Sequence, residues 1–98
     1  MATKFYKVFV RTSADVEFPT DDKEFIEYIT NTYISTGQCL EFRVPQEMPD
    51  ELTMIVVSTW ANDQTLDLAL LDPVWDINTK QTQEYADSHN IFVYSWTE

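Results

Sequence analysis

The chain has 98 residues, of which 44% are hydrophobic and 14% aromatic, and its formal net charge is −11. This apolar share is too high for a disordered chain, and the length corresponds to one domain that covers residues 1–98. Seventeen acidic against six basic side chains exclude the basic footprint that phosphate binding needs, so we expect no direct binding to nucleic acid.

The sequence also excludes an internal disulfide and a membrane-spanning segment. Cys39 is the only cysteine, so an internal disulfide cannot form. No apolar run approaches the roughly 18 residues of a membrane span, and the polar, strand-like N-terminus is unlike a signal peptide. We therefore expect a soluble protein of the reducing cytoplasm that does not contact the membrane.

The first expected elements are a strand and a helix. Residues 5–11 (FYKVFVR) predict a strand with apolar side chains on both faces. FPTDDKEF marks a helix start at which Thr20 or Asp21 can cap free backbone N–H groups. The apolar stripe of this helix is predicted to contain Phe25, Ile26, Ile29 and Tyr33. Gly37, the only glycine, follows at the point where a left-handed residue ends a helix.

Two strands joined by a turn are expected next. In residues 39–44 the apolar Leu40, Phe42 and Val44 alternate with polar neighbours, which indicates an amphipathic strand at a sheet edge. Pro45, Pro49 and Asp50 predict the turn. Residues 52–60 (LTMIVVSTW) form the returning strand, which is apolar on both faces.

The C-terminal half predicts two helices and a strand. Asn62 can cap a short helix with Leu66, Ala69 and Leu70 on one face. Asp72-Pro73 then supplies a fresh cap with proline at the first helical position, so a second helix is expected from 73 toward 88. Its predicted apolar stripe contains Val74, Ile77, Gln81 and Tyr85. Residues 91–96 predict a last strand that is again apolar on both faces.

The expected order is therefore β-α-β-β-α-β, with the second helix broken at Asp72-Pro73. It folds most simply as an α+β, ferredoxin-like protein, a four-stranded antiparallel sheet with the helices on one face. Because the helices cover only that face, the other apolar face needs a partner. We expect a homodimer that packs sheet to sheet. The expected interface residues are Phe5, Phe9, Phe92, Tyr94 and Trp96.

WANDQTLDLALLDPVW, followed by EYADSHNIFVYSW, resembles the C-terminal half of the dimeric α+β barrel proteins, in particular the antibiotic-biosynthesis monooxygenase-like group. The resemblance implies that two sheets close into a barrel between subunits. If the protein is an enzyme, the resemblance also implies oxidation or rearrangement of a small, largely apolar organic molecule in a cavity near Trp60, without a cofactor. The residues that match the Trp, Asn and His of active members are Trp60, Asn62 and, less securely, His89. A fold does not fix an activity.

Each of these candidates has a structural interpretation too. Trp60 can wall a cavity or plug the core, and the side chains of Phe25, Tyr28 and Tyr85 can line the cavity or belong to the core. His89 precedes the last strand, where a turn residue is ordinary. With one histidine and one cysteine we predict no metal site, and we predict no cofactor.

A second hypothesis concerns the acidic residues of the predicted helices, which face only Lys23 and Lys80. They are Asp21, Asp22, Glu24, Glu27, Asp63, Asp67, Asp76, Glu84 and Asp87. Such a negative surface suits a non-enzymatic inhibitor or adaptor that mimics nucleic acid and binds a basic protein. Binding of this kind weakens steeply with salt.

Overall fold

The computed structural model describes residues 2–46 and 50–98 of the chain. The elements follow in the order β1 (Thr3–Val10), α1 (Lys23–Ile29), the π-helix η1 (Thr30–Ile34), β2 (Cys39–Pro45), β3 (Thr53–Trp60), α2 (Asp63–Leu70), α3 (Pro73–Ser88) and β4 (Phe92–Thr97). The expected order of strands and helices is confirmed. Within these ranges no helix is both long and apolar enough to cross a bilayer.

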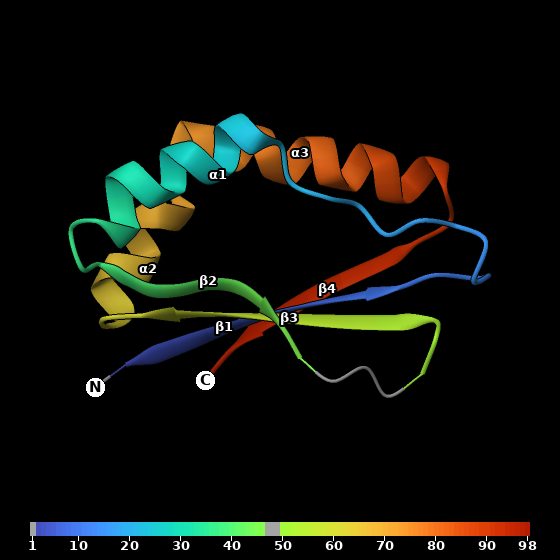
Figure 1. Cartoon of the computed structure of the whole chain (residues 1–98), viewed down its shortest axis with the longest axis horizontal. Coiled ribbons are helices and arrows are strands. Elements are labelled where there is room, and N and C mark those ends of the chain that lie inside the picture. The colour runs from blue at the N-terminus through green and yellow to red at the C-terminus, as the bar shows by residue number, and fades with distance from the viewer. Residues whose placement is uncertain (1, 47–49) are drawn as a thin grey trace.

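The strands form one antiparallel sheet in the order β2-β3-β1-β4. All helices lie on one side of this sheet, and the other side is bare (Figure 1). This arrangement confirms the predicted ferredoxin-like α+β fold, including the edge position of the strand that begins at Cys39.

Strand register decides which side chains face the helices. Lys7 on β1 lies opposite Val56 on β3 and Ser95 on β4. Phe5, on the same face of β1, stacks on Trp75 of α3 with ring centroids 6.4 Å apart. Side chains alternate between the faces of a sheet, so this set of residues points toward the helices. We call the opposite side of the sheet, which no helix covers, the open face.

The open face differs from the expected interface at two positions. Phe5 and Phe9 pack toward the helices, Phe9 in a cluster with Ala86 of α3, so neither is available on the open face. The register places the other three expected residues there, together with further apolar side chains. The open face thus carries Tyr6, Val8, Val10, Ile55, Val57, Phe92, Tyr94 and Trp96.

Edge strand β2 departs from the regular alternation that its sequence predicts. Its pairing with β3 shifts register twice, and Arg43 has a positive φ of 48°. Because a bulge inserts an unpaired residue, the side chains after it change faces. Cys39 and Phe42 therefore pack with the helices, while Leu40 is exposed on the other side. The prediction of one apolar face through Leu40, Phe42 and Val44 was wrong.

The turn after β2 is described only in part, and Pro49 lies outside the described residues. Asp50 supports the predicted turn, because its Oδ1 accepts a hydrogen bond of 2.7 Å from the backbone N–H of Leu52. This is an Asx turn.

Local signals fix most helix ends. Asn62 caps α2 in a capping box with Thr65, and Asp72 accepts a 2.9 Å hydrogen bond from the amide of Val74 with Pro73 at the first position of α3, as predicted. The start of α1 differs from the prediction that Thr20 or Asp21 caps it. Asp22 holds the cap position without a side-chain hydrogen bond, and Asp21 is instead ion-paired to Arg43.

Helix α3 buries a face other than the predicted one. Its buried residues are Trp75, Asn78, Thr82 and Ala86, in place of Val74, Ile77, Gln81 and Tyr85. The large ring of Trp75 selects this face. Asn78 is tolerated inside because its amide bonds to Arg43 and Asp21, which satisfies its polar atoms.

The core between helices and sheet has two separate clusters. One surrounds Trp60 and includes Ile29, Leu66 and Trp75 from the helices. The other surrounds Phe9 and Val56 and includes Ala86 near the end of α3. The contact between helices and sheet is therefore filled toward its two ends, with a gap between the clusters.

Gly37 ends the first helical segment in the left-handed region, with φ of 79°. Nothing lies within 4 Å of a Cβ added there, so the cost of a side chain is purely conformational. We expect Gly37→Ala to lower the free energy of unfolding by about 1 kcal/mol, and Gly37→Asn by less. Urea denaturation measures both. An unchanged midpoint for Gly37→Ala would show that this φ is not required.

Candidate functional site

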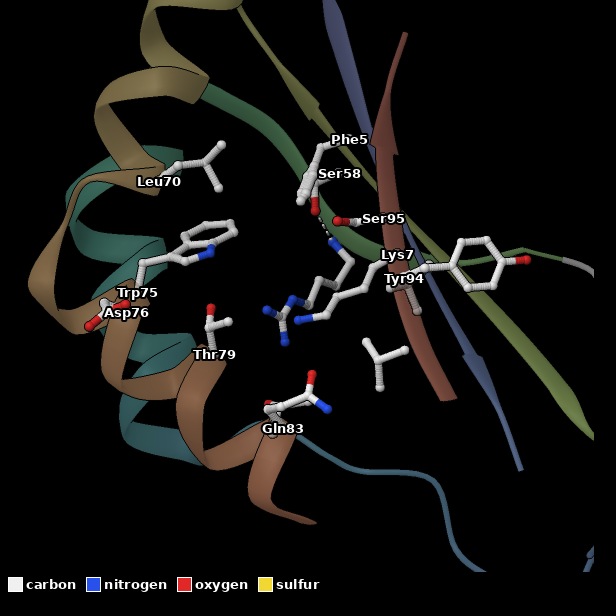
Figure 2. Close-up of a pocket in the computed structure, with 14 residues that line it drawn as sticks. Phe5, Lys7, Ser58, Leu70, Trp75, Asp76, Thr79, Gln83, Tyr94 and Ser95 are labelled. Carbon is white, nitrogen blue, oxygen red and sulfur yellow. Dashed lines mark hydrogen bonds between the residues drawn. The ribbon is translucent and has the colours of Figure 1, made fainter. Parts of the chain in front are cut away.

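A cavity of about 390 Å³ lies between α3 and the sheet. Phe5 and Trp75 form its wall next to the Trp60 cluster. Val56 and Val93 form its wall next to the Phe9 cluster. Its volume falls in the range of small-molecule sites. Figure 2 shows α3 on one side of the cavity and strands on the other.

Two cationic side chains enter this cavity. Lys7 from β1 and Arg43 from β2 both line it. Figure 2 shows the side chain of Lys7 directed into the cavity from the strand side, where Ser58 and Ser95 also lie. Thr79 and Gln83 project from α3, and the ring of Tyr94 points away from the cavity. Apolar walls with a few convergent polar groups are typical of ligand sites.

Arg43 is held on several sides. Its guanidinium is ion-paired with Asp21, and Nη2 donates to Oδ1 of Asn78 at 3.3 Å. The guanidinium carbon lies 5.1 Å from the ring centroid of Phe42 and 5.8 Å from that of Trp75, at cation–π distance. Arg43 is therefore a compensated, fixed charge in the wall of the cavity.

Lys7 is the cation without an ionic partner in the part of the chain that the structure describes, although its Nζ lies 5.8 Å from the ring centroid of Phe9, at cation–π distance. Among residues 2–46 and 50–98 it forms no ion pair. Burial and, secondarily, the repulsion of Arg43 lower the pKa of Lys7 to about 8, against a smaller opposing attraction from Asp21. Near neutral pH this amine is thus present in both protonation states, so it can hold an anion or accept a proton.

The three candidate catalytic residues do not meet. Trp60 is 0% exposed and packs against the rings of Tyr33 and Trp75, at centroid distances of 5.6 and 5.8 Å. It plugs the core and does not line the cavity. Asn62 caps α2, whereas His89 follows the far end of α3 and stacks on Tyr85 at 4.0 Å. The structure therefore gives these residues separate, structural contacts.

The candidate pocket residues also lie outside the cavity. Phe25 is buried in the core beneath Arg43. Tyr28 donates a hydrogen bond of 2.6 Å to Asp72, and Tyr85 donates one of 2.8 Å to the backbone carbonyl of Glu17. Their contacts are those of helix packing.

Tyr28 and Tyr33 share Asp72 as acceptor and thereby tie the first helical segment to the start of α3. Burial acts to raise the pKa of Asp72, but the hydrogen bonds from the two tyrosines and the Val74 amide outweigh it and lower that pKa. Burial, with the bond to Asp72, raises the pKa of Tyr33. These groups keep one protonation state near neutral pH and serve structure.

The thiol of Cys39 is also unreactive near neutral pH. Cys39 is buried, and burial raises the pKa of its thiol to about 11. A thiol in this state is not a nucleophile near neutral pH.

Lys7 and Arg43 were missed as site residues in the sequence. A signal for Lys7 was present, since it is the one charge between Phe5 and Phe9 on the face of β1 that packs inward. Arg43 had no such signal, because its inward direction depends on the bulge in β2.

The folded pKa of Lys7, about 8, lies below its ordinary value of 10.5. The unfolded chain therefore binds this proton more tightly, and the charged lysine destabilises the fold below about pH 8. That penalty disappears as the pH rises to 10.5. We expect Lys7→Met to raise the free energy of unfolding by about 2 kcal/mol near pH 7 and by much less near pH 10.

Denaturant titrations at the two pH values measure this difference. Lys4→Met is the matched control, since Lys4 is exposed on the same strand. An equal effect of both substitutions would contradict the assigned environment of Lys7.

Comparison with known proteins gives structural matches only. Neither protein-family models nor curated proteins match the chain. A proposed antibiotic biosynthesis monooxygenase from Deinococcus radiodurans is similar in structure, with a TM-score of 0.55 and 10% identity over 98% of this chain and 89% of that one.

Two further structures are similar. A conserved protein of unknown function from Bacteroides thetaiotaomicron, for which oxidoreductase activity has been suggested, has a TM-score of 0.57 and 13% identity over 99% and 96% of the two chains. A variant of SnoaB, a cofactor-independent oxygenase from Streptomyces nogalater, has a TM-score of 0.50 and 12% identity over 99% and 90%. At such identities the likeness concerns the fold. The chain thus has the α+β fold of the antibiotic-biosynthesis monooxygenase-like proteins, and the resemblance predicted from its C-terminal half is confirmed at that level.

Proposed function

We propose that the protein binds a small, flat organic molecule in the cavity between α3 and the sheet and oxidises it without a cofactor. The observation that carries this proposal is the cavity itself, about 390 Å³ with the rings of Phe5 and Trp75 on one side and polar groups beside them. The fold shared with a cofactor-independent oxygenase supports the class of reaction. The ring of Trp75 lines the cavity and packs against Trp60 on its other side, so Trp60 does not itself contact the cavity.

The chemistry requires a substrate that can itself reduce O₂. An activated CH₂ group loses a proton to water and becomes a carbanion, which adds O₂. The resulting peroxide anion takes up a proton and becomes a hydroperoxide. Elimination of water then leaves a carbonyl, so that both hydrogens of the CH₂ group and one oxygen atom leave as water. Lys7 and Arg43 line the cavity, and their positive charge favours loss of the first proton because it stabilises the carbanion that forms.

Blocking the cavity tests the proposal. Anthrone, a flat tricyclic compound with one activated CH₂ group, is the probe, and oxygen uptake with anthraquinone formation is the measurement. Thr79 lines the cavity from α3, so Thr79→Trp should fill it and lower the rate at least about tenfold. Glu84→Trp, on an exposed position of the same helix, should leave the rate unchanged. Equal rates in the two variants would exclude the cavity as the reaction site.

We further propose that the functional unit is a homodimer in which the open faces of two sheets pack together. Three aromatic residues of β4 are exposed there, Phe92 at 66%, Tyr94 at 46% and Trp96 at 39%. They form a continuous row, with Trp96 stacked on Tyr6 at 5.0 Å. Monomeric proteins rarely expose a contiguous apolar surface of this kind, and a second copy offers a complementary one.

Analytical ultracentrifugation tests the assembly. We expect a mass twice the 11.5 kDa of one chain at micromolar concentration. Tyr94→Glu should shift the protein to the monomer, because it places a charge in the centre of the apolar row. Leu71→Glu, at a 78% exposed position on the helical side, is the matched control and should stay dimeric. A monomeric wild-type chain would contradict the dimer.

A second candidate function uses the outer surface of the helices. Most of their carboxylates are exposed, although Asp21 is turned inward to Arg43 and Asp76 is paired with Lys80 at 2.9 Å. The net charge of −11 favours a basic protein partner for this surface. Capture of such a partner at low salt, lost on raising the salt severalfold and unaffected by Thr79→Trp, would support the adaptor in place of the enzyme.

A further inference from the structure

We propose that the molecule held in the cavity carries a carboxylate group, bound by the ammonium of Lys7 and the hydroxyls of Ser58 and Ser95. The inference rests on the proposed function, since it names the class of compound that the same cavity takes. It depends on three features: the positions of these side chains, the local balance of charge and the free hydrogen-bond donors.

The three side chains come from adjacent strands on the helix-facing side of the sheet. Lys7 on β1 is directly opposite Ser95 on β4, and Phe5, its neighbour on the same face, is opposite Ser58 on β3. Opposed side chains have Cβ atoms about 5 Å apart. Figure 2 shows Ser58 and Ser95 close together at the strands, with the side chain of Lys7 extending from the same sheet into the cavity. Two hydroxyls and one ammonium suit the two oxygens of a carboxylate.

The charges of the cavity leave one cation without a counterpart. The guanidinium of Arg43 is matched by Asp21. Asp76, an acid in the cavity wall, is matched by Lys80 outside it. Lys7 forms no ion pair in the described part of the chain, although the molecule as a whole has a net charge of −11. A half-buried, unpaired cation in so acidic a protein points to an anion supplied by the ligand.

Ser58 has a donor to offer. Its Oγ accepts a 2.9 Å hydrogen bond from the backbone N–H of Arg43, so its own hydrogen remains for another acceptor. Ser58 is buried in the cavity floor, whereas Ser95 is exposed at the side of β4. A carboxylate bridging them stays near solvent while its ring system reaches inward to Phe5 and Trp75. Hydrogen bonds to a charged acceptor are the stronger ones.

Carboxylate binding should also move the titration of Lys7. The charged groups that face it are Arg43 from β2, Asp21 from the segment before α1 and Asp76 from α3. A bound anion stabilises the ammonium and raises the pKa of Lys7 above the present value of about 8. Binding near pH 8 is therefore accompanied by proton uptake, and affinity falls as the pH rises further.

Isothermal titration of the full chain with two matched probes tests the inference. The probes are 1-naphthoate and 1-naphthalenemethanol, which share the ring system and differ in charge. We expect wild type to bind the naphthoate at least about tenfold more tightly than the alcohol. Lys7→Met should remove this preference, and Ser95→Ala should reduce it severalfold. Lys4→Met, an exposed change on the same strand, should retain it.

The outcomes separate the two proposals. A naphthoate preference that disappears in Lys7→Met, with proton uptake on binding near pH 8, supports the carboxylate site. Equal or tighter binding of the alcohol, or a preference that survives Lys7→Met, overturns the carboxylate inference and leaves the proposed function standing. Failure of both probes to bind, together with no oxidation of anthrone, overturns the proposed function as well. Lys7→Gln, which retains a polar but neutral side chain, repeats the test if Lys7→Met does not fold.

Discussion

The arrangement of helices over the sheet depends on Arg43 and its ion pair with Asp21. The pair joins β2 to the segment before α1, and Asn78 connects both to the middle of α3. Phe25, Phe42 and Trp75 surround the guanidinium. Removing one partner of a buried pair typically costs about 3–5 kcal/mol, and the cost here is smaller because both side chains keep some access to solvent. Trp75, which forms one wall of the cavity, lies 5.8 Å from the guanidinium carbon of this pair.

The cavity exists because the two core clusters are separated, and its polar content acts against stability. A methionine in place of Lys7 would suit the fold better, since desolvation and Arg43 both disfavour the ammonium there. Proteins that keep a destabilising group at one position often do so for function. The cavity combines this group with aromatic walls and hydroxyls, whereas Trp60, Asn62 and His89 lie outside it, in packing and capping contacts. The buried Nε1 of Trp60 has no hydrogen-bond partner within the described residues. We therefore propose Lys7 and its neighbours as the site residues, in place of the three residues that the family resemblance implied.

Several elements could be predicted because their signals are local. Gly37 in the left-handed region, the Asn62 capping box and the Asp72-Pro73 start of α3 each depend on a few consecutive residues. The strand order followed from the sequence of elements and the simplest antiparallel connection.

Other features depend on contacts between distant residues and could not be predicted. Strands that are apolar on both sides do not reveal which side faces the helices, so Phe5 and Phe9 were grouped with residues of the opposite face. The alternation of β2 concealed its bulges, and with them the inward direction of Arg43. Asn78 and Thr82 are polar, so the buried side of α3 was assigned to its apolar neighbours. The sequence FYKVFVR put Lys7 on the strand face that also carries Phe5 and Phe9. Only the structure shows that Arg43 lies close enough to lower the pKa of Lys7.

The most direct test of this account is the pKa of Lys7 in the ligand-free protein, measured by heteronuclear NMR of its side-chain amine as a function of pH. Burial in the cavity and the neighbouring guanidinium predict titration at about 8. Titration at the ordinary lysine value of 10.5 would mean that Lys7 lies in open solvent, and the cavity would then have no unpaired internal cation.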